Sequence, residues 1–149
     1  MKRFILSLLL AFCFFYGLSQ SEKVALQDLL IQNTWTDGDG TGKMVVGKMI
    51  NARYRFTLDT LYVSLIELGA GGEVKKPYYL SETPDLSFNE NRIGKCRNGD
   101  YLIIKTRDTS PCVLKIKSYS DSLIEYEYYF KIKKQNIEYI RQGTFVPVE

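Results

Sequence analysis

Apolar and polar positions alternate most regularly between Cys112 and Val146, where the chain predicts three consecutive strands. In the middle strand, Ser122–Ile132, one face carries Ile124, Tyr126, Tyr128 and Phe130, and the other carries Leu123, Glu125, Glu127 and Tyr129. A period of two in a Pro-free segment rich in aromatic and β-branched residues is typical of half-buried antiparallel strands. The flanking strands are predicted at Cys112–Ser118 and Asn136–Val146. One face of this three-stranded unit is apolar and must be covered.

Similar strand patterns recur earlier in the chain. They predict strands at Lys43–Ile50, Ala52–Leu58, Thr60–Leu68, Glu73–Leu80 and Tyr101–Arg107. Pro77 has no N–H for a strand ladder, so we expect its strand to lie at an edge or to bulge there. Helical spacing of Leu26, Leu29 and Leu30 predicts a short amphipathic helix over Ser19–Gln32. The segment Ser81–Gly94 is the longest without a regular pattern.

About eight strands at short spacing predict one mostly β domain, either an up-and-down barrel or a sandwich. Most of the connections have the length of plain hairpins, which favours the up-and-down barrel. Closure into a barrel would also remove the exposed sheet edges that Tyr- and Ile-rich strands otherwise offer for aggregation. We therefore expect an antiparallel barrel with a short helix at its beginning.

The first residues predict a secretory signal peptide. Met1-Lys2-Arg3 is a positive start, Phe4–Tyr16 is an apolar segment, and Gly17-Leu18-Ser19 offers small residues for cleavage. The apolar run is shorter than the roughly 18 residues of a membrane-spanning helix. Lipidation at Cys13 is not expected, because bulky Phe12 precedes it. The prediction is a leader at 1–19, a domain at 20–149, and a periplasmic or extracellular location.

Composition narrows the classes of function. The net charge is +3, and removing Lys2 and Arg3 with the leader leaves +1. That balance does not predict a nucleic-acid partner, which usually needs a strongly basic surface. The chain has no His, the commonest general base and transition-metal ligand. The acidic segment Asp37–Gly42 lacks the Glu that would complete a calcium loop, since Lys48 stands at that position. No metal or cofactor is predicted.

Two cysteines remain after leader removal, Cys96 and Cys112. An oxidising compartment favours a disulfide between them. A hairpin joining the strands at 101–107 and 112–118 would separate them by over roughly 20 Å at about 3.3 Å per residue, whereas a disulfide needs Cα atoms within about 7 Å. A looped path before Asn98 would bring them back together. Both alternatives stay open.

An enzyme is not expected. Glu125 and Glu127 share a strand face and resemble a carboxylate pair, but Lys115 and Lys117 on the preceding strand predict cross-strand ion pairs on a solvated face. Arg53 and Arg55 are expected to face solvent. No catalytic residue is assigned.

Aromatic residues in the predicted strands are the candidates for ligand binding, because a ring supplies apolar contact and a phenol hydroxyl orients a polar group. The candidates are Tyr54, Phe56, Tyr62, Tyr126, Tyr128 and Tyr139. A barrel of this size either fills with side chains or holds one small ligand. Bulky aromatics favour filling, and the two outcomes imply different functions.

The helix ending in Leu29-Leu30, the Asn33-Thr34-Trp35 start of the first strand, the repeated hairpins and the late Arg141 resemble the lipocalin-like (calycin) domains, particularly small secreted ones of Bacteroidetes-type bacteria. The resemblance implies that Trp35 packs at the closed end of a barrel and that Arg141 lies across its indole. The chain departs from the family at the Gly that precedes the Trp, where Gln32 or Asn33 stands.

These observations predict a non-enzymatic, secreted protein that binds a small apolar or amphipathic molecule in the cell envelope. The alternative is a solid barrel that acts as a protein-interaction or inhibitor module through its loops. A third hypothesis is an envelope enzyme using carboxylates or Tyr. A cavity of roughly 300 Å³ or more lined by Tyr126 and Tyr128 would favour the first, and a filled interior would favour the second.

Overall fold

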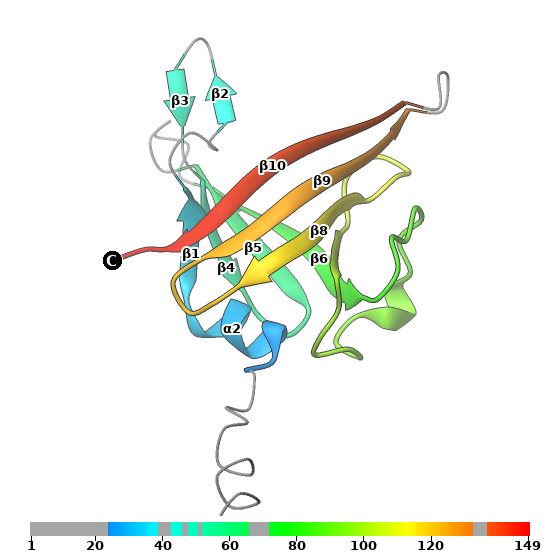
Figure 1. Ribbon diagram of the computed structural model, residues 1–149, viewed down its shortest axis with the longest axis horizontal. Coiled ribbons are helices and arrows are strands. Elements are labelled where there is room, and N and C mark those ends of the chain that lie inside the picture. Colours follow the sequence, from blue (N-terminus) through cyan, green and yellow to red (C-terminus); the bar gives the residue numbers. More distant parts are fainter. Residues whose placement is uncertain (1–23, 39–42, 46–47, 51, 66–71, 133–136) are drawn as a thin grey trace, which may run out of the picture.

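The computed structural model describes residues 24–38, 43–45, 48–50, 52–65, 72–132 and 137–149, with side chains described outside 43–50, 130–132 and 137–141. Eight strands close into an antiparallel barrel in the order β1-β10-β9-β8-β7-β6-β5-β4 (Figure 1). They are β1 (Thr34–Asp37), β4 (Arg53–Phe56), β5 (Thr60–Ser64), β6 (Glu73–Ser81), β7 (Tyr101–Ile104), β8 (Cys112–Tyr119), β9 (Ile124–Ile132) and β10 (Ile137–Pro147). The predicted up-and-down barrel with a short helix before it is confirmed.

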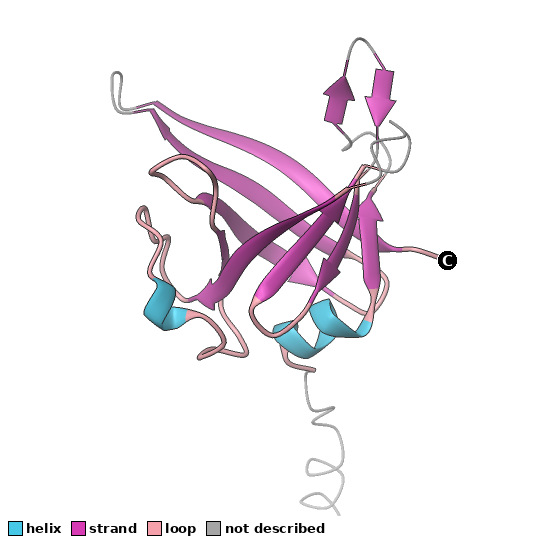
Figure 2. Cartoon of the chain, turned by 180° about the vertical axis from the view of Figure 1, so that it is seen from behind, coloured by secondary structure: helices cyan, strands magenta, loops and turns pink. Residues whose placement is uncertain are grey.

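A separate hairpin projects from one end of the barrel, and two short helices lie towards the other (Figure 2). The hairpin consists of β2 (Lys43–Val45) and β3 (Lys48–Ile50), with Lys43 paired to Ile50. The prediction of one strand over Lys43–Ile50 was therefore wrong, because its two halves pair with each other instead of with a barrel strand. The helices are α2 (Leu26–Gln32) and a 3-10 turn at Glu90–Arg92 within the segment predicted to lack regular structure.

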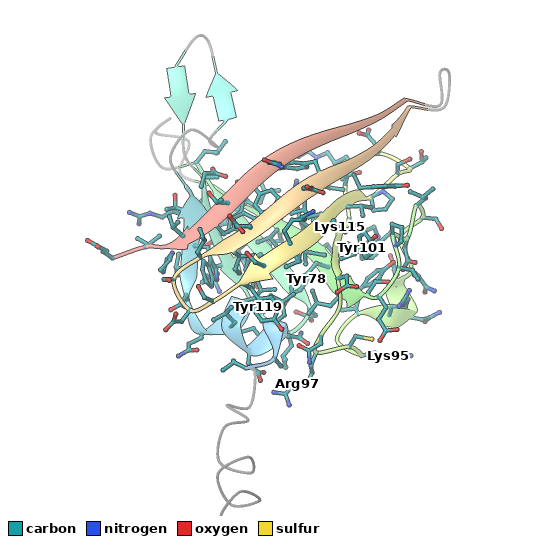
Figure 3. All side chains as sticks on the ribbon, in the orientation of Figure 1. Tyr78, Lys95, Arg97, Tyr101, Lys115 and Tyr119 are labelled. Carbon is teal, nitrogen blue, oxygen red and sulfur yellow. The ribbon has the colours of Figure 1, made fainter. Side chains whose placement is uncertain are left out.

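The N-terminus of α2 is held by a distant loop. The backbone N–H of Leu26 donates to Asn98 Oδ1 at 2.8 Å, and that of Gln27 donates to the Arg97 carbonyl at 3.0 Å. These bonds satisfy donors that a helix leaves unpaired at its start. The side chain of Arg97 also pairs with Asp28, and Figure 3 shows Arg97 at the end of the barrel where α2 lies. The α2 helix thereby plugs this end, which we call the closed end.

Inward-facing residues alternate with outward-facing ones along the barrel strands, and they form the main core. Large aromatic rings fill its centre. Tyr126 and Phe145 have ring centroids 4.5 Å apart, Tyr54 and Phe145 4.8 Å, and Phe56 and Tyr78 5.2 Å. The expectation that bulky aromatics fill the interior holds in this part of the barrel.

A second apolar cluster lies on the opposite face of three of the same strands. Tyr79, Ile103 and Val113 are buried there, and Phe88 and Ile93 of the connection between β6 and β7 pack against them. Asp85 fastens this connection by accepting hydrogen bonds from Tyr79, Ser81 and Arg92. The segment without a regular pattern therefore covers the outer face of β6, β7 and β8.

Gly143 on β10 faces the ring of Tyr126 on β9, with which it is paired. A Cβ at this position would lie 2.5 Å from the Tyr126 ring, whereas one at Gly72 would meet nothing within 4 Å. Substitution Gly143→Ala should therefore lower the free energy of unfolding by about 1–3 kcal/mol through overpacking. Gly72→Ala should leave it unchanged or raise it slightly, because it only restricts the unfolded chain.

Chemical denaturation of both variants, followed by circular dichroism, measures this difference. Equal stability of the two variants would mean that Tyr126 does not need the space that Gly143 leaves.

Candidate functional site

The wall of the barrel is incomplete at the end opposite α2, because β6 is longer than the strand beside it. Residues Tyr78–Ser81 of β6 pair with β7, whereas Glu73–Pro77 pair with β5. The last link on the β7 side runs from the Lys105 N–H to the Pro77 carbonyl at 2.9 Å. Within the described residues, no strand pairs with Glu73–Lys76 on that side. A notch therefore opens between the overhang of β6 and the β7–β8 connection.

The short β7 follows from local hydrogen bonding after it. The Thr106 hydroxyl donates to the Ser110 carbonyl at 2.7 Å and accepts from the Asp108 N–H at 3.2 Å. Such side-chain bonds compete with a strand ladder. They make the chain turn at a position where the sequence pattern predicted a strand continuing to Arg107.

A groove of about 560 Å³ occupies the notch. Its apolar lining comes from Val63, Leu65, Val74 and Pro77, and Val63 is the cross-strand partner of Val74. Val63 and Leu65 also pack against the main core. The floor of the groove is thus continuous with the barrel interior, although the groove opens to solvent. We call this feature the notch groove.

Four cationic side chains border the notch groove, Lys75 and Lys76 from β6 and Lys105 and Arg107 from the β7–β8 connection. Lys105 forms an ion pair with Glu90, and the Lys75 ammonium lies 5.6 Å from the centre of the Tyr62 ring. Within the described part of the chain, Lys76 and Arg107 have no ion-pair partner. No carboxylate among the described residues lines the groove. As far as the described residues form it, the rim is therefore electropositive above an apolar floor.

Three of the residues predicted to bind a ligand lie in the packed interior. Tyr54, Phe56 and Tyr126 are buried in the main core. Half-buried Tyr128 packs against the same core, and its ring centre lies 5.4 Å from that of Tyr126. A smaller hollow of about 280 Å³ borders Tyr126, but Lys117, Glu125 and Gln142 line it as well and Tyr128 does not. Neither Tyr126 nor Tyr128 lines the notch groove.

Tyr62, another candidate for ligand binding, lies on the outer face of the barrel. Its neighbours Leu61 and Val63 pack with the core, so alternation turns Tyr62 outwards. The Arg55 guanidinium lies 3.9 Å from the centre of the Tyr62 ring and forms an ion pair with Glu73. Arg53 and Arg55 are exposed, as predicted. The side chain of Tyr139 is outside the described residues.

A buried polar contact sits at the edge of the aromatic core. Asp37 is only 3% exposed; its Oδ1 accepts from the Tyr54 hydroxyl at 2.9 Å, and its Oδ2 accepts from the Ala52 N–H at 2.8 Å. Burial, followed by the negative charge of Asp37, raises the pKa of Tyr54 well above its ordinary value. Asp37, singled out in the sequence as the start of an acidic turn, therefore joins β1 to β4.

Trp35 is fully buried, and its indole N–H donates to the Leu30 carbonyl of α2 at 3.0 Å. This contact joins the first barrel strand to the plug of the closed end. The side chain of Arg141, predicted to lie across the indole, is outside the described residues. On the backbone, Arg141 pairs with Tyr128, while Trp35 pairs with Pro147 of the same strand β10.

The two cysteines are not joined by a disulfide. Both are half-buried and pack against the main core, and Cys112 pairs with Ile104 beside the β7–β8 connection, as the hairpin geometry required. One of the cross-strand ion pairs predicted for Glu125 and Glu127 is present. Glu127 forms an ion pair with Lys117 at 3.2 Å, and Glu125 accepts from the Ser118 hydroxyl.

Metal-binding clusters of three or more His, Cys, Asp or Glu residues do not occur among the described residues. None of the helices in the described part of the chain is long and apolar enough to span a membrane. Comparison of the chain with protein-family models, curated proteins and solved structures found no match.

The sequence pattern did not predict the notch groove or the outer apolar cluster. Lys75-Lys76 before Pro77 and the pair Lys105 and Arg107 were visible as charges, but their convergence depends on where β7 stops. The signal for the outer cluster was Tyr79, Ile103 and Val113, each flanked by inward-facing apolar residues. Strands apolar on both faces indicate burial on both sides.

The buried tyrosines predict loss of stability in alkali. Burial raises the pKa of Tyr78 to about 12 from the ordinary 10 and also raises the pKa of Tyr126. A group whose folded pKa is raised contributes stability that is complete below pH 10 and is lost as the pH rises towards 12. Tyrosinate absorbance should therefore show exposed tyrosines ionising near pH 10, and the buried ones ionising only together with loss of the circular dichroism signal.

Substitution Tyr78→Phe removes one of these groups. The free energy of unfolding should therefore fall less between neutral and alkaline pH in this variant than in the unsubstituted protein. Tyr101→Phe, at a half-buried position, serves as the control. Ionisation of all tyrosines near pH 10 without unfolding would contradict the burial argument.

Proposed function

We propose that this protein is a secreted, lipocalin-like binding protein of the cell envelope, and that it takes up a small amphipathic molecule at the notch groove without catalysing a reaction. The observation that carries the proposal is the apolar floor of a groove of about 560 Å³ that is continuous with the barrel core. Sites for small molecules typically measure roughly 300–1,000 Å³ and are lined mainly by apolar side chains with a few polar groups.

The position of the site follows from the packing. Contacts among Tyr54, Phe56, Tyr126 and Phe145 occupy the centre of the barrel. Opening a cavity there would require separating close-packed rings, which costs several kcal/mol for residues of this size. The notch groove needs no such rearrangement. We therefore assign ligand contact to Val63, Leu65 and Val74 instead of the aromatic residues favoured by the sequence.

The proposed location rests on the leader predicted at 1–19 and on the resemblance to small secreted lipocalin-like domains. An envelope binding protein would meet amphipathic molecules that partition poorly into water. A groove with an apolar floor and a charged rim would shield the apolar part of such a molecule from water and leave its polar part hydrated. This matches the arrangement of the notch groove.

The second candidate function is a protein-interaction module, and the packed aromatic centre of the barrel favours it. In that case the notch groove would be a surface feature without a small-molecule ligand. The two functions differ in one measurable respect, which is whether a small apolar probe binds at the groove.

Binding of the neutral fluorescent probe N-phenyl-1-naphthylamine tests the proposal. Val74→Trp places a large ring in the notch groove and should weaken probe binding by about tenfold or more, equivalent to about 1.4 kcal/mol. Leu86→Trp enlarges a similarly exposed apolar residue that does not line the groove, and it should leave binding unchanged.

Circular dichroism should first establish that both variants are folded. Absence of probe binding to the unsubstituted protein would favour the interaction module. Equal weakening by the two substitutions would place the probe elsewhere on the protein.

A further inference from the structure

We infer that the ligand of the notch groove is a single-chain amphiphile with an anionic head group, held by Lys76 and Arg107 at the rim while its chain lies on Val63, Leu65 and Val74. The inference rests on the proposed function and names the chemical class that the groove selects. It goes beyond apolar burial, because it predicts discrimination between molecules that share a chain and differ in charge.

The first support is the sign of the charge around the groove. Lys75, Lys76, Lys105 and Arg107 border it, and no carboxylate among the described residues does. Of the nearby described acids, Glu73 pairs with Arg55, which does not line the groove, whereas Glu90 pairs with Lys105 and neutralises that one cation of the rim. A concentration of one charge sign over a low-dielectric surface raises the local concentration of oppositely charged ligands.

The second support is the place of Lys76 in the strand. Lys76 pairs with Leu61 and shares its face of β6 with Val74 and Tyr78. This face points to the barrel interior at Tyr78 and to the groove at Val74. A half-buried lysine in such a place lays its methylene stem on apolar neighbours and keeps its ammonium at the polar boundary. The alkyl chain and the head group of a ligand would therefore contact neighbouring residues, Val74 and Lys76, on one face of β6.

The third support is that the cations at the groove are not all neutralised. Lys76 and Arg107 have no ion-pair partner within the described residues, so a ligand anion would not need to displace one. An arginine can donate two parallel hydrogen bonds to a carboxylate or phosphate. Arg107 comes from the β7–β8 connection and Lys76 from β6, so an anion between them would bridge the two sides of the notch.

The size of the groove favours one chain over two. Its volume of about 560 Å³ is in the lower half of the range for small-molecule sites. The floor residues interact with a chain through burial alone, which does not distinguish a neutral from a charged amphiphile. Selectivity for the anion must therefore come from the rim.

Competition for the N-phenyl-1-naphthylamine site tests the inference with ligands that share a dodecyl-length chain, used below their micelle concentrations. Laurate and dodecyl phosphate should displace the probe at concentrations about tenfold lower than neutral monolaurin, as expected for one charge-assisted contact. Dodecyltrimethylammonium should be the weakest competitor. Raising the salt concentration should narrow the difference between anionic and neutral competitors, because the rim is solvent-exposed.

The double variant Lys76→Gln with Arg107→Gln should reduce the advantage of the anions to about threefold or less, which is the loss expected when the charged contacts go. The matched control, Lys95→Gln with Lys115→Gln, makes the same change in net charge at residues that do not line the groove, and both are labelled in Figure 3. The control should keep the full advantage.

Equal displacement by laurate and monolaurin would overturn the inference and leave the proposed function standing. Failure of every dodecyl ligand to displace the probe would overturn both. Displacement by inorganic phosphate alone, at concentrations similar to dodecyl phosphate, would show that the rim binds a free anion and would overturn the assignment of an amphiphile. If the control variant also lost the preference for anionic competitors, the preference would come from the net charge of the protein, and this too would overturn the inference.

Discussion

Pairing of β1 with two partners at once is the contact on which the barrel depends. This strand has four residues, yet Trp35 pairs with Pro147 of β10 on one side and with Tyr54 of β4 on the other. Without β1, the strands β4 and β10 would be open edges available to other chains. Side chains of the same strand reinforce the closure, since Asp37 bonds to the β4 side and Trp35 bonds to α2.

The interior is divided into a packed part and an open part for reasons that can be traced to particular side chains. Rings of Tyr54, Tyr126 and Phe145 meet in the centre, and Gly143 leaves the space that the Tyr126 ring occupies. Towards the notch, the inward-facing residues of β5 and β6 become smaller aliphatic ones, Val63 and Val74. The groove exists where aromatic filling stops and β7 has already ended.

One wall of the notch is supported from outside the barrel. The connection between β6 and β7 packs Phe88 and Ile93 onto Tyr79, Ile103 and Val113, which makes the strands beside the notch apolar on both faces. Lys105, which follows β7 directly, is tied to Glu90 of the same connection. The outer cluster therefore stabilises the point at which the chain leaves β7. The segment Ser81–Gly94, which has no regular pattern in the sequence, provides this support. The end of the barrel opposite α2, where the notch groove lies, therefore stays accessible.

The residues alone determined the fold class, because alternation of period two in about eight segments leaves few ways to cover one apolar face each. They also separated the two faces of β9 and placed Arg53 and Arg55 outside. They did not tell which face of β5 was inside, so Tyr62 was a candidate for ligand binding although Leu61 and Val63 are the residues that face the interior. Nor did they show that Lys43–Ile50 folds on itself, or where β7 ends. These outcomes depend on the lengths and registers of neighbouring strands, and only the closed tertiary structure sets them, since each strand's limits are decided by the partner against which it hydrogen-bonds.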